Sequence, residues 1–315
     1  MKTQVTETIF KSVLVRAGQF FSMVALGAVI LICSSASAQN LFVSGRDADG
    51  GEIFQFTWDG GQSIFASGLY KPWDMAFDSA GNLFFVDYEI VGGDLRGNAA
   101  IFKITPNGTL SIFASGLSYA STLTVDKAGN LFVADYDNGI IYQYKSTGSR
   151  AAFASGLYHP VGMALDSADN LFVADNSIGN IYQGSIYKYK PDGSRVTVAV
   201  LDPGDRPADL AFDSMGNLYM GDLGGKIYRY DLSGVLRRQG RTTFGSVPNS
   251  AQSLAFDSAG NLLVVDGGDV NGTGTGSANA IYKFTPQAVR STFASAQSLG
   301  ESFACLAFQP MPCCQ

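Results

Sequence analysis

The sequence predicts an all-β fold: a six-bladed β-propeller with four antiparallel strands in each blade. The first observation is an internal repeat, because the segment Asp-Ser-Ala-Gly-Asn-Leu at residues 78–83 returns with small changes four more times. Its asparagine stands at positions 82, 130, 170, 217 and 261, and these intervals of 48, 40, 47 and 44 residues match one propeller blade. The second is composition, since 37 glycines and only 15% charged residues are typical of a turn-rich β protein.

Each repeat contains four short strands. The first is apolar and ends in aspartate, as at 75–78, and a Ser-Ala-Gly turn joins it to the second at 83–86. The third alternates in polarity and is rich in aromatic residues. Its copies are 101–104, 141–144, 186–189, 227–230 and 281–284. The fourth strand is a Phe-Ala-Ser-Gly segment at 65–68, 113–116 and 153–156. This period-two pattern with glycine turns favours antiparallel strands.

The two ends of the chain carry complementary partial repeats, which is the third observation. Residues 40–43, 53–56 and 63–66 supply a second, third and fourth strand with no first strand before them. Residues 306–308 form a first strand with nothing after it. We therefore predict that the C-terminal strand joins the N-terminal blade as its innermost strand, which closes the ring and leaves only short blade edges exposed.

Residues 1–38 are predicted to be a signal peptide rather than part of the domain. Basic residues precede an apolar run at 20–32, and Ala36-Ser-Ala38 supplies the small-x-small pattern of a cleavage site before Gln39. The alternative is an uncleaved anchor, although the run is short for a membrane span. We expect a secreted or periplasmic protein whose single domain, 39–315, has no membrane span and is a monomer.

The charge of the mature chain argues against some partners. Residues 1–38 hold three basic residues and one acidic residue, so 18 basic and 26 acidic residues remain and the net charge changes from −6 to −8. An acidic domain without basic clusters is a poor candidate for binding nucleic acid. Cys305, Cys313 and Cys314 also remain. Their number is odd, so their pairing stays open.

Two segments of the fourth repeat carry a family resemblance. They are Pro-Val-Gly-Met-Ala-Leu-Asp at 160–166 and Asp-Asn-Leu-Phe-Val-Ala-Asp-Asn at 169–176, and Ile-Tyr-Lys-Tyr third strands accompany them. With these motifs residues 39–308 resemble the NHL-repeat propellers and the related senescence-marker-protein/gluconolactonase superfamily. The resemblance implies the fold. It does not imply one activity, because this scaffold carries lyases, lactonases and binding modules.

Recurrence within the chain separates scaffold residues from site candidates. An aspartate ends the second strand in five of the six repeats: Asp87, Asp135, Asp175, Asp222 and Asp266. Another aspartate opens each Ser-Ala-Gly turn: Asp78, Asp126, Asp166, Asp213 and Asp257. A role needed five times is structural, and we predict that these carboxylates accept hydrogen bonds from nearby loop amides.

The resemblance also allows a test of metal-dependent hydrolysis. Gluconolactonase-like enzymes hold a divalent metal at the channel with a glutamate and with asparagine and aspartate residues just before first strands. The matching positions here are Trp73, Ser121, Val161, Ala208, Gln252 and Ala304. None is a carboxylate or an asparagine, and hard cations need several oxygen ligands. We therefore expect this metal site to be absent. Because His159 is the only histidine, a three-histidine zinc site is excluded as well.

A calcium ion is the one cofactor for which the sequence offers candidates. Residues 47–52 (Asp-Ala-Asp-Gly-Gly-Glu) and 269–273 (Asp-Val-Asn-Gly-Thr) contain alternating oxygen ligands. Neither continues into a complete calcium-binding loop, so solvated loops are the preferred interpretation.

The site is expected at the channel mouth, on the rim that carries the variable connections. These are residues 46–51, 88–99, 136–139, 176–184, 223–225 and 267–279. Variable loops on a rigid scaffold are where function usually lies. Alignment of the six first strands places Asp74, Thr122, Gly162, Asp209, Ser253 and Cys305 at one equivalent position.

Within that aligned set, Asp74 and Asp209 should face each other across the axis. They would bind a cation or a polar ligand, or one of them would have a raised pKa. The alternative is that both cap backbone amides. The predicted aromatic wall comprises Tyr70, Trp73, Tyr119 and Tyr158, and His159 is a further rim candidate.

These observations lead to two functional hypotheses. The first is an exported binding or scaffold propeller that presents its variable rim to a small molecule, a carbohydrate or a protein partner. The second is a lactonase-like hydrolase, active on lactones or esters, with a rearranged channel site. The second would need carboxylates that converge on the channel.

Overall fold

A computed structural model describes residues 39–46, 50–57, 61–88, 99–176, 183–232, 240–267, 280–295 and 302–310. The chain divides into two compact units, and these residues all belong to the unit that spans residues 37–313. The predicted signal segment and the two calcium-loop candidates lie wholly or partly outside the described residues. Nothing in the described part of the chain is a helix, so it holds no helix long and apolar enough to cross a membrane.

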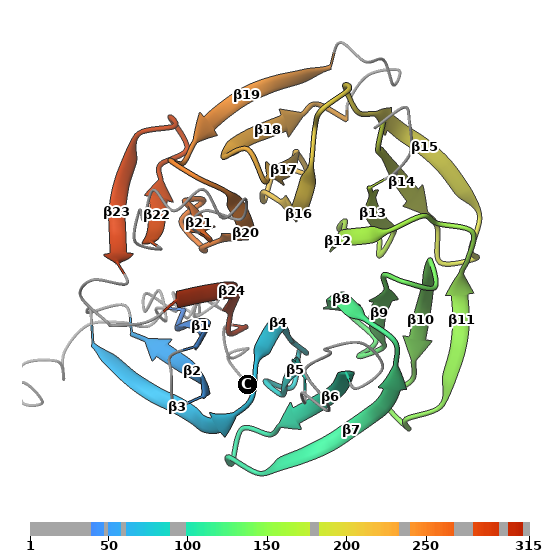
Figure 1. Ribbon diagram of the computed structural model, residues 1–315, viewed down its shortest axis with the longest axis vertical. Helices are drawn as coiled ribbons and strands as arrows, with labels where there is room; N and C mark the ends of the chain where they lie inside the picture. Colours follow the sequence, from blue (N-terminus) through green and yellow to red (C-terminus); the bar gives the residue numbers. More distant parts are fainter. Residues whose placement is uncertain are drawn as a thin grey trace, which may run out of the picture. The chain divides into compact units, whose positions relative to one another are not determined.

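The described residues form six four-stranded antiparallel sheets, one for each blade (Figure 1). Blade 1 comprises β24 (Ser302–Phe308), β1 (Leu41–Arg46), β2 (Gly51–Phe56) and β3 (Gln62–Leu69). Blade 2 comprises β4 (Pro72–Phe77), β5 (Leu83–Tyr88), β6 (Ala99–Ile104) and β7 (Leu110–Leu117). Blade 3 comprises β8 (Ala120–Val125), β9 (Leu131–Asp135), β10 (Ile140–Tyr144) and β11 (Arg150–Ala154).

The other three blades repeat this order from the inside outward. Blade 4 comprises β12 (Pro160–Leu165), β13 (Leu171–Asp175), β14 (Ser185–Tyr189) and β15 (Arg195–Val200). Blade 5 comprises β16 (Pro207–Phe212), β17 (Leu218–Asp222), β18 (Lys226–Tyr230) and β19 (Arg241–Ser246). Blade 6 comprises β20 (Ala251–Phe256), β21 (Leu262–Asp266), β22 (Ala280–Phe284) and β23 (Arg290–Ser295).

The C-terminal strand closes the ring, and the predicted fold is confirmed. β24 pairs with β1 in an antiparallel ladder, with Val43 opposite Leu306 and Leu41 opposite Phe308. In Figure 1 the red β24 lies beside the blue β1 at the inner edge of blade 1. Each of the six innermost strands contacts the innermost strand of the next blade, and β20–β24 and β24–β4 complete the circle.

The turn between the first and second strands is built the same way in five blades. In blade 2, Asp78 Oδ1 accepts the amide of Asn82 at 2.8 Å, and Asn82 Nδ2 donates to Asp78 Oδ2 at 2.7 Å. Gly81 has φ +79°, a left-handed conformation that favours glycine. Asp169 takes that place in blade 4 with φ +57°, which a short polar side chain tolerates. The predicted structural role of these aspartates is confirmed.

The hydrophobic core lies between neighbouring blades. The second strands are buried along their whole length, because both of their faces meet side chains from an adjacent sheet. Between blades 1 and 2, for example, Phe42 packs edge-on to Phe77, with ring centroids 4.9 Å apart. This packing holds the innermost strands at fixed positions around the channel, where the candidate site is formed.

Candidate functional site

A β-bulge near the start of each innermost strand turns one side chain towards the channel. In blade 4, Pro160 pairs with Asp175 and Gly162 pairs with Ala174, so Val161 has no partner across the ladder. The same irregularity occurs in all six blades, and in blade 2 it also includes Asp74. A bulge interrupts the pleat and re-aims the side chain it carries. The six bulge residues are Trp73, Ser121, Val161, Ala208, Gln252 and Ala304.

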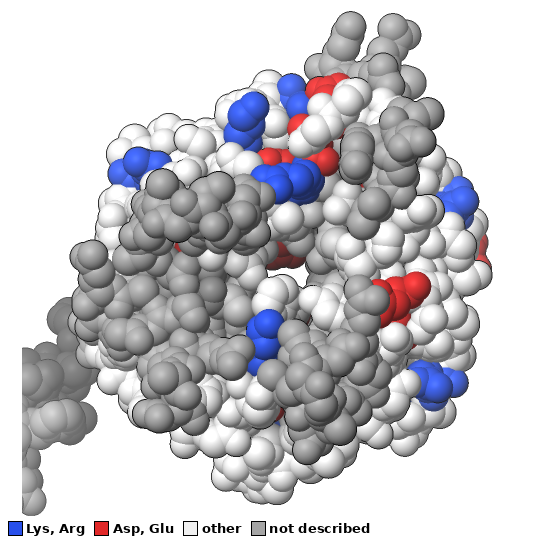
Figure 2. Space-filling view, viewed as in Figure 1, with Lys and Arg blue, Asp and Glu red and all other residues white. Residues whose placement is uncertain are grey.

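All six bulge residues line a cavity of about 460 Å³ in the channel. Figure 2 shows the central hollow, with acidic atoms visible inside it. Tyr136, Asp137, Asn176 and Leu223 add a wall from the connections that follow the second strands of blades 3, 4 and 5. The cavity therefore opens towards the rim that carries the variable connections, where the sequence placed the site.

Each of the two channel aspartates binds one backbone amide of its own blade and one of the next blade. Asp74 Oδ1 accepts the amide of Met75 at 2.9 Å, and its Oδ2 accepts the amide of Leu123 in blade 3 at 2.7 Å. Asp209 repeats this geometry, with the amides of Leu210 and, in blade 6, Leu254, both at 2.8 Å. Each carboxylate therefore caps amides, as the alternative interpretation expected, and also lines the cavity.

Other residues at the same strand position continue this inter-blade belt. Ser253 Oγ in blade 6 accepts the amide of Leu306 in blade 1 at 3.2 Å. The Cys305 thiol in blade 1 donates to Asp74 Oδ1 in blade 2 at 2.8 Å. Gly162 leaves no room for a side chain, since an added Cβ would lie 2.7 Å from the Cα of Asp209. The belt forms the floor of the cavity and joins the blades around it.

Burial is the largest influence on the pKa values of Asp74, Asp209 and Cys305. Desolvation raises the pKa of Asp74, although hydrogen bonds from Cys305 and Leu123 oppose the rise. The pKa of Asp209 is raised well above its usual range, first by desolvation and then by the charge on Asp74. Burial and the same two carboxylates raise the pKa of the Cys305 thiol. Burial therefore shifts the two carboxyl groups and the thiol in the same direction, towards their protonated forms.

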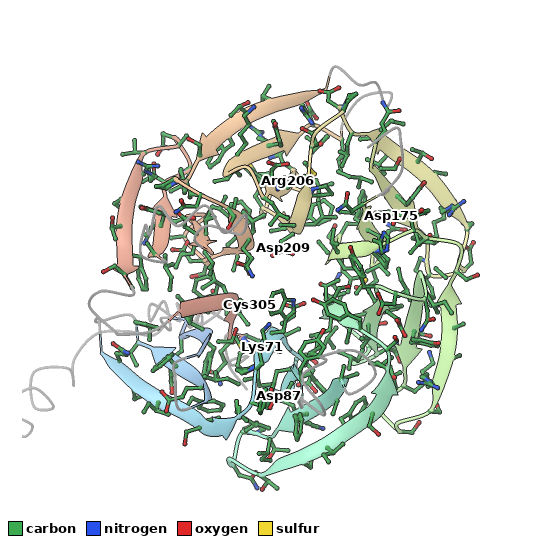
Figure 3. The ribbon with its side chains drawn as sticks, in the orientation of Figure 1. Lys71, Asp87, Asp175, Arg206, Asp209 and Cys305 are labelled. Carbon is green, nitrogen blue, oxygen red and sulfur yellow. The ribbon has the colours of Figure 1, made fainter. Side chains whose placement is uncertain are left out.

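The aspartates that end the second strands hold the turns at the rim, as predicted. Oδ1 of Asp175, which is labelled in Figure 3, accepts the amides of Tyr158 at 3.0 Å and His159 at 2.8 Å. Asp87 and Asp266 likewise accept two amides of the corresponding turns. Asp135 accepts the amide of Ser118, and Asp222 accepts that of Arg206. These carboxylates fix the turn that precedes each bulge, and so they set the entry to the cavity.

The structure brings together only part of the predicted site. Trp73, Asp74, Tyr119 and Asp209 line the cavity. Tyr70 and Tyr158 are 39% and 53% exposed on the rim and are not among the residues that line it. His159 is also outside the lining. Its ring packs against Tyr136 and Tyr158, with centroids 4.2 Å and 4.9 Å away.

The sequence placed the connections 136–139, 176–184 and 223–225 on the rim of the expected site, but it singled out none of the lining residues within them. Tyr136, Asn176 and Leu223 each follow directly after the aspartate that ends a second strand. That fixed offset was a signal that could have identified them, since the aspartate anchors the rim beside the channel. Asp137 lies one residue further along the blade 3 connection.

The bulge residues do not fit the metal that the family resemblance implies. Their only side-chain oxygens are the hydroxyl of Ser121 and the amide oxygen of Gln252, whereas a hard divalent cation needs several oxygen ligands, preferably charged. Among the described residues no group of three or more histidine, cysteine, aspartate or glutamate side chains could hold a metal ion. Asp74 and Asp209 belong to opposite blades, and each already binds two backbone amides.

Comparison with solved structures finds the same fold at low sequence identity. A chain of a nidogen–laminin complex aligns with a TM-score of 0.69 and 16% identity, covering 88% of this chain and all of that one. A gluconolactonase from Xanthomonas campestris aligns at 0.58 and 16%, covering 71% and 76%. Virginiamycin B lyase from Staphylococcus aureus aligns at 0.55 and 15%, covering 80% and 84%. These similarities show the fold.

The curated proteins offer no match to this chain. Residues 35–224, more than half of the chain, match the family described as SMP-30/Gluconolactonase/LRE-like region. The matched residues contain the bulges of blades 2 to 5 and therefore most of the cavity wall. The chain belongs to the SMP-30/gluconolactonase/LRE-like family.

Proposed function

We propose that this chain is a binding propeller whose channel takes up one small polar molecule with an apolar face. The observation that carries this proposal is the set of six bulge residues, which point into one cavity and offer contact surface rather than metal ligands or nucleophiles. A volume of about 460 Å³ lies within the range of small-molecule pockets, roughly 300–1,000 Å³.

The cavity lining combines aromatic side chains with carboxyl groups, which suits a polar ligand that has an apolar face. Trp73, Tyr119 and Tyr136 form an aromatic wall on the side of blades 2 and 3. Aromatic faces pack against the C–H faces of sugars and similar amphipathic ligands. The floor supplies carboxyl groups that hydrogen-bond to hydroxyls. Such a cavity suits a carbohydrate or another compact ligand with hydrogen-bonding groups on one face.

Calorimetry with a panel of sugars and lactones tests this proposal. Replacing Trp73 by alanine removes aromatic surface from the cavity, and we expect binding about tenfold weaker or more. Tyr158→Ala is the matched control, because that ring is exposed on the rim and does not line the cavity. Binding that is unaffected by Trp73→Ala, or equally weakened by both changes, would contradict a channel site.

Hydrolysis of a lactone is the second candidate. Two observations favour it: the family to which the chain belongs, and the pair of channel acids, whose pKa values burial raises. A protonated and an ionised carboxyl across one cavity can act as general acid and general base. Because the bulge residues offer too few oxygen ligands for a divalent metal, the reaction proposed here is one that needs no such metal.

A lactone hydrolysis assay with and without a metal chelator decides between the two candidates. Hydrolysis that survives the chelator and is lost in Asp209→Asn would favour the enzyme. Ligand binding without turnover in the same preparation would favour the binding protein. We also propose export with cleavage after Ala38, and intact mass measurement should find a chain that begins at Gln39. Retention of Met1 would favour an uncleaved anchor.

A further inference from the structure

A row of aromatic rings connects blades 2, 3 and 4 beside the cavity. The rings of Tyr88 and Tyr119 have centroids 5.4 Å apart, and Tyr119 lies at the same distance from Tyr136. The Tyr136 ring in turn lies 4.2 Å from the His159 ring, at an angle of 33°. Tyr119 and Tyr136 line the cavity, whereas Tyr88 and His159 are not among its lining residues. Each lining tyrosine is therefore backed by a ring that stands outside the cavity.

Both ring pairs cross the seam between two neighbouring blades at the same two chain positions. Tyr88 and Tyr136 each follow directly after the aspartate that ends a second strand. Their ring partners, Tyr119 and His159, each stand two residues before a bulge residue of the next blade. The other four seams carry no aromatic residue at either position. The arrangement is therefore confined to the side of the cavity that Trp73 also lines.

The backbone of His159 is held at both of its peptide groups. Its amide donates to Oδ1 of Asp175 at 2.8 Å, and its carbonyl oxygen accepts the amide of Asn176 at 2.9 Å. Pro160 follows directly, and a proline restricts the backbone of the residue before it. His159 therefore presents its ring from a fixed point of blade 4.

The side chain of Tyr136 starts from a connection rather than from a strand. The amide of Tyr136 donates to the carbonyl oxygen of Tyr119 at 2.8 Å, which places the backbone but does not direct the ring. Because Tyr136 follows the end of β9, the strand ladder does not direct its ring either. The ring contacts Tyr119 of its own blade and His159 of the next. The histidine ring is thus the support that the neighbouring blade supplies.

The His159 ring provides this support by packing. Its Nδ1 is buried and has no hydrogen-bond partner among the residues that the structure describes. A buried polar atom that is left unpaired is unfavourable, whereas tilted aromatic rings in contact attract each other. A phenyl ring at this position should therefore support Tyr136 as well as the imidazole does.

We propose that His159 is a positioning residue, which holds the Tyr136 ring in the cavity wall and so sets the affinity for a ligand with an apolar face. The inference rests on the proposal that the channel is the binding site. It gives the single histidine of the chain a role behind the wall rather than inside the cavity. Contact between two such rings favours one arrangement by roughly twofold to tenfold, which is the size of effect to be measured.

Nitration by tetranitromethane tests the positioning of Tyr136 without any ligand. Peptide mass mapping of the native proteins should find Tyr136 nitrated at least about threefold faster in His159→Ala than in the wild type, because the ring has lost its neighbour. His159→Phe should react at the wild-type rate. Tyr70, which is 39% exposed on the rim, is the internal reference. Unchanged nitration of Tyr136 in His159→Ala would overturn the inference.

Calorimetry with methyl β-D-glucoside, a sugar with an apolar C–H face, tests the effect on the site. We expect His159→Ala to weaken binding by roughly twofold to tenfold, and His159→Phe to restore the wild-type affinity. Tyr70→Ala is the matched control, because this rim ring does not line the cavity. Melting curves verify that each variant folds.

A double-mutant cycle then asks whether His159 acts through Tyr136. His159→Ala should weaken binding of the glucoside no further when Tyr136 is already alanine, since both changes then remove the same ring from the wall. Losses that add, or a phenylalanine variant that binds as weakly as the alanine variant, would overturn the positioning role.

The failures of the two proposals are distinguishable. If the glucoside binds in a manner that depends on Trp73 but not on His159, the channel remains a site and the positioning role is overturned. If Tyr136 nitration responds to His159→Ala while the glucoside and the other sugars and lactones do not bind, the support of the ring is upheld, and the binding function is overturned together with the effect of His159 on affinity.

Discussion

Replacing Leu306 by alanine tests the closure of the ring. Leu306 lies in β24, is only 4% exposed, and pairs with Val43 at the other end of the chain. It packs in a cluster that joins blade 1 to Leu263 and Val265 of blade 6. Truncating a buried leucine to alanine costs about 2–5 kcal/mol, since transfer free energy is lost and a cavity remains. In a domain of this size 1 kcal/mol shifts the melting temperature by roughly 2–4 °C, so we expect a loss of roughly 4–20 °C.

Thermal and urea unfolding of three variants measure this effect. Leu210→Ala is the matched buried control, because Leu210 is 3% exposed at the equivalent position of blade 5 and should lose a similar amount. Leu110→Ala is the exposed control, at 48%, and should change the stability by less than about 0.5 kcal/mol. A Leu306→Ala protein that melts with the wild type, while Leu210→Ala does not, would refute closure by the C-terminal strand.

Three further predictions concern the channel floor. Folding raises the pKa of Asp209 above its value in the unfolded chain. Between these two pKa values the folded protein binds a proton that the unfolded chain has lost. The free energy of unfolding should therefore fall as the pH rises through that range. Asp209→Asn cannot titrate, so its melting temperature measured from about pH 4 to about pH 8 should lack that fall, and parallel profiles would refute the assignment. The Cys305 thiol should resist alkylation in the native protein and react after unfolding, as peptide mass mapping can show; rapid native labelling would contradict its burial. Gly162→Ala should cost about 1–3 kcal/mol, because its Cβ would clash with the Asp209 backbone, and an unchanged urea midpoint would argue against that close approach.

The local features of the blades could be predicted because they depend on short stretches of sequence. Alternation of apolar and polar residues, aromatic third strands and the Ser-Ala-Gly turns predicted the strands that the structure contains. Closure by the last strand followed from matching the partial repeats at the two ends. The scaffold role of Asp175 and its equivalents followed from recurrence, since a residue needed in five blades serves the blade and not a single site.

The candidate site was predicted less completely, because side-chain direction there depends on the bulge. Tyr70 and Tyr158 precede the bulges and lie exposed on the rim, although the sequence placed them in the aromatic wall. Trp73 occupies the bulge itself and lines the cavity. Tyr136 enters the wall from a connection between strands, and no strand pattern predicts the direction of its side chain.

The sequence by itself determined the number of blades and the strands within each blade. Only the tertiary structure decided how the site residues meet. Asp74 binds an amide 49 residues away in the next blade, and the Cys305 thiol reaches Asp74 across 231 residues. Such contacts depend on the distance between neighbouring blades, which the packing of their buried faces sets. A repeat pattern specifies each blade, whereas the cavity and its charges arise only when six blades close around one axis.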